Sequence, residues 1–304
     1  MITSRISDWV ESRVGGRSVI HAAMRKVFPD HWSFLLGEVA MYSFIVLLLT
    51  GVYLTFFFVP DAEQIVYQGS YNALNGIEMS RAYESTLRLS FDIDGGLLIR
   101  QMHHWAALVF VAAVFAHLLR IFFTGAFRRP REINWVIGLT MLLLAIVNGF
   151  AGYSLPDDLL SGTGLRIAYS IAESVPIVGT RLAGLAFGGA YPSAEIIPRL
   201  YTLHILLVPV LIGVLLSVHL ALLVRQKHTQ FSGPGRTASN VVGTRLWPGF
   251  AAKTVGLFFL VAATLALLAG LAQINPIWLY GPYHPAQVSA PAQPDWYMGW
   301  LEGA

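Results

Sequence analysis

Long uninterrupted runs of apolar residues dominate the pattern of hydrophobic and polar positions along the chain. A helix that crosses the hydrocarbon core of a membrane needs about 20 such residues. Five segments reach that length, at residues 39–59, 101–119, 133–156, 200–224 and 254–274. Because backbone polar groups in a bilayer must be satisfied internally, each run is predicted to be an α-helix. The pattern predicts an all-α polytopic membrane protein, with a four-helix bundle plus a fifth transmembrane helix.

The composition supports this interpretation. Hydrophobic residues make up 55% and charged residues 12% of the 304 residues, whereas a soluble domain carries about 25% charge. So few charges cannot cover a water-facing surface, which disfavours a soluble enzyme, a disordered chain and a nucleic-acid binder. The chain contains no cysteine, which excludes disulfides, thiolate metal sites and cysteine nucleophiles within it.

Charges alternate in sign from one connection to the next. Basic residues dominate 5–26, 128–131 and 225–253, and acidic residues dominate 61–94 and 157–195. The positive-inside rule therefore predicts an N-terminus on the inner, cytoplasmic side and a C-terminus on the outer side of the membrane. The acidic pair Asp157-Asp158 is interpreted as solvated loop charge, with a role in proton exit left open.

The same pattern divides the chain into five stretches. Residues 1–33 are predicted to be an inner-face segment with an amphipathic helix near 6–14. Residues 34–226 form the four-helix core, in which 156–197 contain short outer-face helices at about 164–175 and 180–187. The rest is an inner loop at 227–249, a fifth transmembrane helix at 250–274 and an outer loop at 275–304.

Histidines occur in two of the predicted membrane helices, where ionisable side chains are costly and are candidates for function. His103 and His117 are 14 residues apart, and His204 and His219 are 15 apart. At about 100° and 1.5 Å per residue, each helix carries two imidazoles on one face, about 21 Å apart. His104 falls on a different face and is excluded as a partner.

Because both helices run in the same direction, the four histidines are predicted to form two stacked sites. His103 and His204 lie at the outer level, and His117 and His219 at the inner level. An iron porphyrin with two axial histidines fits each site. Isolated polar residues at helix interfaces, metal transport and a haem-free transporter are the alternatives.

Glycines in the two other core helices show a matching spacing. Gly37 and Gly51 are 14 residues apart, and so are Gly138 and Gly152. Glycine lets a backbone approach a flat macrocycle closely. We therefore expect these four positions to leave space at the same two levels.

Several motifs span most of the chain. They are Trp32-Ser33-Phe34, Thr50-Gly51, Arg100-x-x-His103, His117-x-x-Arg120, Gly152-Tyr153-x-Leu155-Pro156, Gly188-Gly189 and Pro294-Asp295-Trp296-Tyr297. Together they resemble the cytochrome b subunit of quinol:cytochrome c oxidoreductases, the cytochrome bc1 and b6f family, and actinobacterial members in particular. The last motif is similar to the family's Pro-Glu-Trp-Tyr. Family members continue with further helices beyond this motif, so the chain is expected to be part of a longer protein.

The resemblance implies two b-type haems, ligated by the two histidine pairs, with Arg100 and Arg120 near their propionates. It also implies two quinone sites. The outer site, where quinol is oxidised, would comprise Tyr153, Pro294, Asp295, Trp296 and Tyr297. Asp295 would accept the proton, and Tyr297 and Tyr153 would complete the catalytic set. The inner site, where quinone is reduced, would comprise Trp32, Ser33, Glu38 and Lys253.

The resemblance implies a respiratory enzyme with bifurcated quinol oxidation coupled to proton translocation. One electron would pass to a Rieske iron–sulfur subunit and the other through the haems to quinone. The similarity to actinobacterial members favours menaquinone and a location in the bacterial plasma membrane. A cytochrome c subunit, a terminal oxidase, membrane lipid and a dimeric complex are the implied partners, and nucleic acid is not among them. The alternative is a b-haem membrane anchor of another quinone-linked oxidoreductase, which would not bifurcate electrons.

Overall fold

The computed structural model describes residues 9, 11–13, 15–16, 21, 24–237, 240–287 and 292–302. Five helices in this part of the chain are long and apolar enough to cross a membrane, which confirms the predicted all-α membrane fold. They are α3 (Leu36–Thr55), α5 (Gly96–Phe123), α6 (Glu132–Tyr153), the continuous helix Ile196–Gln226 and the continuous helix Leu246–Leu271. Most of the predicted amphipathic helix at 6–14 lies outside the described residues, although Trp9 and 11–13 are helical.

Two of these membrane helices are built from several parts. The fourth combines α9 (Ile196–Thr202), a π-helical turn η3 (Leu203–Leu207) and α10 (Val208–Gln226). The fifth combines η4 (Leu246–Phe250) and α11 (Ala251–Leu271). The apolar run at 101–119 is shorter than α5 at both ends, because residues beyond the run continue the helix. The apolar run at 39–59 extends past the end of α3, which stops at Thr55 ahead of Pro60.

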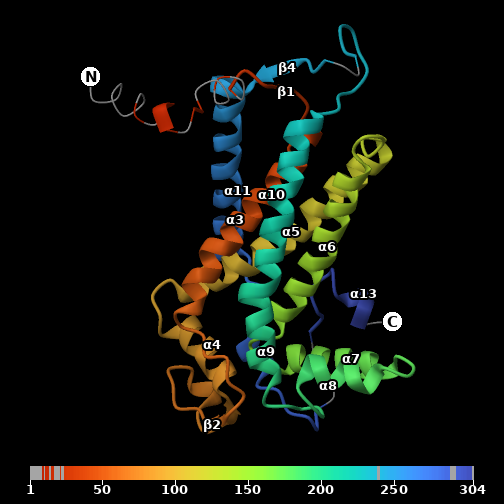
Figure 1. Cartoon of the computed structure of the whole chain (residues 1–304). Coiled ribbons are helices and arrows are strands. Elements are labelled where there is room, and N and C mark those ends of the chain that lie inside the picture. Colours follow the sequence, from red (N-terminus) through yellow and green to blue (C-terminus); the bar gives the residue numbers. More distant parts are fainter. Residues whose placement is uncertain are drawn as a thin grey trace.

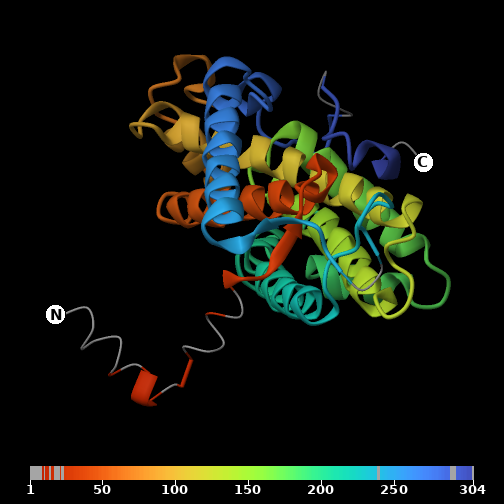
Figure 2. The ribbon, with the colours of Figure 1, turned by 90° about the horizontal axis from the view of Figure 1, so that it is seen from above.

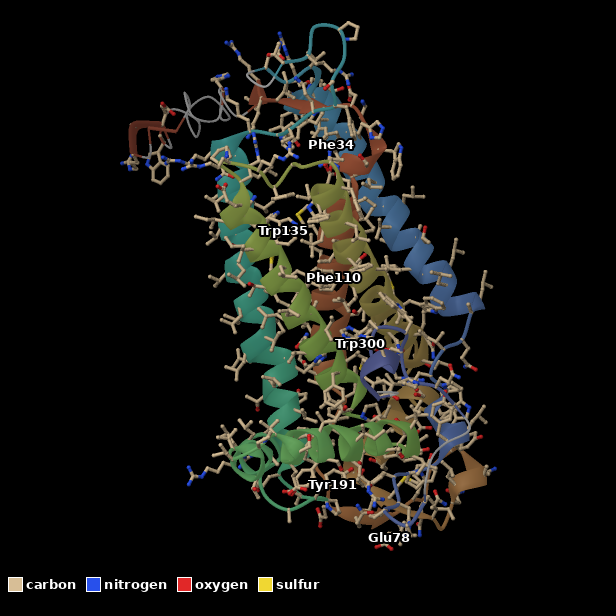
Figure 3. The ribbon with its side chains drawn as sticks, turned by 90° about the vertical axis from the view of Figure 1, so that its right-hand side faces the viewer. Phe34, Glu78, Phe110, Trp135, Tyr191 and Trp300 are labelled. Atoms are coloured by element: carbon tan, nitrogen blue, oxygen red, sulfur yellow. The ribbon has the colours of Figure 1, made fainter. Side chains whose placement is uncertain are left out.

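The core of the bundle lies between α3, α5, α6 and α10, and α11 packs along α3 and α5 (Figures 1 and 2). Phe44, Phe110, Leu142 and Ile212 are buried together at its centre. Figure 3 shows Phe110 midway along the bundle. Apolar side chains also cover the outside of the helices, as expected of a surface that meets lipid.

One end of the bundle carries a short two-stranded sheet and is called the β1–β4 end below (Figure 1). Strand β1 (Val27–Pro29) pairs antiparallel with β4 (Gly243–Arg245), with Phe28 opposite Thr244. The 3-10 turn η1 (Trp32–Phe34) then leads into α3. Figure 3 shows Phe34 and Trp135 toward this end of the molecule.

The opposite end carries the longer connections and is called the α7 end below (Figures 1 and 3). The connection between α3 and α5 contains η2 (Asn72–Leu74), α4 (Arg81–Phe91) and the antiparallel strands β2 (Gln64–Val66) and β3 (Glu78–Ser80). The predicted short helices between α6 and α9 are present as α7 (Leu159–Ser174) and α8 (Gly179–Phe187). After α11 come α12 (Ile277–Tyr280) and α13 (Gly299–Glu302).

Candidate functional site

The four membrane histidines face one another in two pairs. The ring centroids of His103 and His204 are 6.0 Å apart, with the ring planes at 75°. Those of His117 and His219 are 6.5 Å apart, with the planes at 72°. A metal bonds a histidine nitrogen at about 2 Å, so each gap can hold one metal ion between two rings. The spacing of 14 and 15 residues thus brings together the partners that the helical geometry predicts.

Hydrogen bonds orient both rings of the His103 pair. The Thr50 hydroxyl donates to the Val46 carbonyl oxygen at 2.7 Å, so it accepts from Nδ1–H of His103 at 2.8 Å. Nδ1–H of His204 donates to the Asn148 carbonyl oxygen at 2.9 Å. Metal-bound histidines use their second nitrogen in this way, which leaves Nε2 of each ring for a metal. The sequence analysis missed Thr50 as an orienting residue, although its motif contains it.

The predicted glycines lie against these rings. A Cβ atom at Gly37 would come within 3.2 Å of the His117 ring, and one at Gly51 within 3.3 Å of the His103 ring. A Cβ at Gly152 would overlap the His204 ring. Gly138 differs, because its Cβ would meet Leu118 at 3.4 Å. Small residues on α3 and α6 are therefore what allows the histidines to fit between the helices.

Each histidine pair opens onto a cavity. The His117 cavity, of about 210 Å³, is lined by both rings of its pair and is mostly apolar, with Phe34, Phe110 and Trp135 among its walls. The His103 cavity, of about 150 Å³, is lined by both rings of the other pair and by several polar side chains. These polar side chains include Arg100, His104, Tyr153, Asn275, Asp295 and Tyr297.

Arg100 presents unpaired hydrogen-bond donors to the His103 cavity. Its Nη1 donates to the Asn275 carbonyl oxygen at 3.2 Å, and its side chain lies 5.6 Å from the Trp278 ring centroid. Its Nε and Nη2 are buried and have no hydrogen-bond partner among the described residues. A buried cation is stable only with a counter-charge. The cavity therefore fits a bound group with an anionic arm, such as a haem propionate.

Arg120 lies at the corresponding position near His117. Its guanidinium carbon is 3.9 Å from the Phe34 ring centroid, a cation–π contact. Its Nε is also buried with no hydrogen-bond partner in the described part of the chain. Both predicted arginines thus keep buried donors beside their histidine pairs.

The polar wall of the His103 cavity combines residues from distant parts of the sequence. Asp295 Oδ1 accepts from His104 Nε2 at 2.7 Å, with the two side chains 14% and 13% exposed. Tyr297 is 3% exposed. Its burial is the main cause that raises the pKa of its hydroxyl, and the nearby Asp295 carboxylate is the second. Tyr153 lies on the same wall, whereas Trp296 is 53% exposed and Pro294 does not line the cavity.

The sequence analysis missed two members of this wall. His104 was excluded as a haem ligand, and its contact with Asp295 joins residues 191 positions apart. Gly149 makes room for Tyr297, since a Cβ there would come within 2.5 Å of the tyrosine hydroxyl. No local pattern could have identified either contact.

The four residues predicted for the inner quinone site are only partly brought together. Glu38 lines the His117 cavity and accepts from the Thr254 hydroxyl at 2.5 Å. Lys253 instead pairs with Asp30 at 2.9 Å, since it lies on the other side of α11 from Thr254. Trp32 is 70% exposed and Ser33 is buried. Neither lines the cavity, whereas His228 and Arg131 do.

The interpretation of Asp157-Asp158 as solvated charge is wrong for Asp158. Asp158 is 0% exposed and caps α7, accepting from the backbone amides of Leu160 and Ser161 and from the Ser161 hydroxyl. A helix N-terminus offers unpaired amides that such a carboxylate satisfies. Asp157 is half-buried, and burial raises the pKa of its carboxyl from 3.8 to about 7. The short helices of this end were predicted from sequence, but the burial of Asp158 at the start of α7 was not.

Five membrane-length helices with two facing histidine pairs define a class of membrane proteins that hold metal-containing groups between their helices. A family model described as "Cytochrome b(N-terminal)/b6/petB" matches residues 108–282. The chain belongs to this cytochrome b family, whose members carry b-type haem.

Curated relatives agree with this assignment. The chain is 56% identical over 299 residues to the cytochrome bc1 complex cytochrome b subunit of Streptomyces coelicolor, covering 98% of this chain and 55% of that protein. It is 57% identical over 303 residues to the corresponding subunit of Mycobacterium leprae, covering 99% of this chain and 55% of that protein. The resemblance to actinobacterial members is thus confirmed. The chain spans about half the length of these relatives.

A solved structure supports the fold. A hyperthermophilic respiratory complex III chain superposes with a TM-score of 0.76, covering 96% of this chain and 74% of that chain. The sequence identity is 20%, so the comparison carries the fold alone.

The raised pKa of Asp157 predicts a specific pH dependence of stability. The folded state binds this proton more tightly than the unfolded state. The contribution of Asp157 is therefore complete below about pH 4 and is lost as the pH rises to about 7. We expect Asp157→Asn to raise the unfolding temperature relative to the unmodified protein progressively over this range, as followed by tryptophan fluorescence. Asp94→Asn, which removes an exposed acid from the same end, controls for loss of charge. A difference that does not change with pH would contradict the prediction.

Proposed function

We propose that this chain is the cytochrome b subunit of a respiratory bc1-type complex that couples quinol oxidation to proton translocation. Quinol is oxidised at the α7 end with bifurcated electron transfer. One electron passes to a Rieske iron–sulfur subunit, and the other crosses the membrane to reduce quinone at the β1–β4 end. Two b-type haems, one for each histidine pair, would supply the path for the second electron when bound.

A single observation carries this proposal. The cavity lined by Tyr153, Asp295 and Tyr297 opens directly onto the His103–His204 pair. Quinol oxidation releases protons and electrons together, so a proton acceptor must lie beside an electron acceptor. A cavity with a carboxylate on one wall and two facing imidazoles on another meets that requirement.

The residues of the α7 end have distinct proposed roles. The Asp295 carboxylate is the proton acceptor for the quinol hydroxyl, as a general base must lie within hydrogen-bond reach of the proton. The hydroxyls of Tyr153 and Tyr297 orient the quinol ring, and Tyr297 stays protonated because its pKa is raised. Arg100 would hold an anionic arm of a bound haem through its unpaired donors. Pro294 and Trp296 shape the chain around Asp295.

At the β1–β4 end, Glu38 is the proposed contact for quinone, because it lines the His117 cavity. Arg120 would hold the second haem there. Trp32, Ser33 and Lys253 stay sequence predictions for this site.

The charge pattern supports an orientation with the β1–β4 end and the N-terminus in the cytoplasm of a bacterial cell. The curated relatives are described as subunits of a cytochrome bc1 complex. By extension, a Rieske subunit, a cytochrome c subunit and a terminal oxidase are the proposed partners in a dimeric complex. Menaquinone is the proposed substrate.

Haem content tests the two-site arrangement. A pyridine haemochrome count and a reduced-minus-oxidised spectrum of the purified complex should give two b-type haems per chain. His204→Leu should remove only one of them and His219→Leu only the other. One haem in the unmodified protein would favour a membrane anchor that conducts electrons without bifurcation. No haem in folded protein would favour a haem-free transporter.

The glycine contacts predict a steric loss of one haem. Gly152→Ala adds a Cβ that overlaps the His204 ring, so this variant should keep only the haem of the His117 pair. Gly213→Ala in α10 is the matched control, because its Cβ would meet nothing within 4 Å. The haem absorbance of both variants, measured per chain, checks this. Equal haem content in the two would contradict the role of Gly152.

Replacement of the proposed proton acceptor tests the chemistry. Asp295→Asn should lower the rate of quinol oxidation by about 10²–10⁴-fold, the usual contribution of a positioned general base. Both haem spectra should stay unchanged, since Asp295 touches neither histidine pair. Steady-state turnover with a soluble quinol analogue measures the effect. Turnover equal to that of the unmodified complex would remove Asp295 from the mechanism.

A further inference from the structure

We propose that His104 is a positioning residue, which holds the Asp295 carboxylate at the His103 cavity in the orientation that accepts the quinol proton. The proposal rests on the function proposed above for this cavity. It assigns a role to a residue that the haem arrangement leaves unused, because His104 contacts Asp295 and belongs to neither histidine pair.

The contact itself has the geometry of a charge-assisted hydrogen bond. Nε2 of His104 and Oδ1 of Asp295 are 2.7 Å apart, at the short end of the range for an N–H donor and a carboxylate. Both side chains are almost buried, at 13% and 14% exposed. Because little water competes for either group, the contact is well placed to select one rotamer of the carboxylate.

Asp295 needs such a partner because it lies on a connection between helices. Its backbone carbonyl oxygen accepts from the amides of Met298 and Gly299 at 2.8 and 3.1 Å, which fixes the main chain as a turn but does not hold the carboxylate. Tyr297 contacts the carboxylate from the same connection, so His104 is its support from a membrane helix. His104 lies within α5, a helix of 28 residues. The imidazole thus ties a loop carboxylate to the most rigid kind of support in the bundle.

The position of His104 in the sequence adds a second consequence. His103 faces His204 across the bundle, while the adjacent His104 contacts Asp295. One peptide unit of α5 therefore sets the distance between the histidine pair and the carboxylate. With Oδ1 engaged by His104, the carboxylate also contacts the Tyr297 hydroxyl and can still accept from a quinol hydroxyl, since a carboxylate can accept several hydrogen bonds.

Four variants of the intact complex test this role. His104→Phe keeps a ring but removes the donor, and His104→Gln keeps an N–H donor on a side chain of similar reach. Asp295→Asn and the double variant His104→Phe/Asp295→Asn complete a cycle. His284→Phe, at an exposed histidine of the same end, is the control and should leave turnover unchanged.

We expect His104→Phe to lower kcat of quinol oxidation by about 10–100-fold with little change in KM, because a misplaced catalytic group costs up to about 10² in rate. His104→Gln should recover most of the rate. The double variant should be no slower than Asp295→Asn alone, since residues that act as a unit are not additive. Both haems should be present in every variant.

Three results would overturn the proposal. They are full turnover in His104→Phe, losses that multiply in the double variant, and loss of the outer haem in both His104→Phe and His104→Gln, which would assign the residue to support of His103. Failure of the proposed function is distinguishable, because Asp295→Asn would then also retain full turnover. A slow Asp295→Asn variant beside a fast His104→Phe variant overturns only the role of His104.

Discussion

The packing of imidazoles inside an apolar bundle is the constraint on which the rest of the structure depends. A polar group in hydrocarbon is costly unless it is paired, so His103 and His204 must find partners for their nitrogens. The Thr50 hydroxyl bonds Nδ1 of His103, and the Asn148 carbonyl oxygen bonds Nδ1 of His204. The two rings face one another, which leaves Nε2 of each ring for a metal. The distance between α5 and the fourth helix, and the glycines on α3 and α6, follow from this requirement.

The two ends of the bundle repeat the histidine pair but surround it differently. Around His117 the wall carries Glu38, the cations Arg131 and Lys227, and His228. Around His103 the wall carries an acid, a cation and three tyrosines contributed by α5, α6, α9 and the chain after α12. A site that handles protons needs such groups, and the short elements of the α7 end shield them from bulk water. Asp158, which caps α7 and is fully buried, is a further enclosed acid at this end.

The sequence alone determined the membrane class, the five helices and the pairing of the four histidines. Apolar length and the 3.6-residue helical period act over short distances along the chain, so spacings of 14 and 15 residues carry enough information. The same holds for the glycines at Gly37, Gly51 and Gly152, whose period matches that of the histidines. Motifs such as Pro294–Tyr297 identified the polar end through resemblance.

Only the tertiary structure decided which distant side chains meet. His104 contacts Asp295 across 191 residues, Lys253 pairs with Asp30 rather than joining Glu38, and Asp158 is enclosed at the start of α7. Periodicity specifies the face of a helix that a residue occupies, but not the element that packs against that face. These contacts depend on how helices and connections pack in three dimensions, which no local pattern encodes.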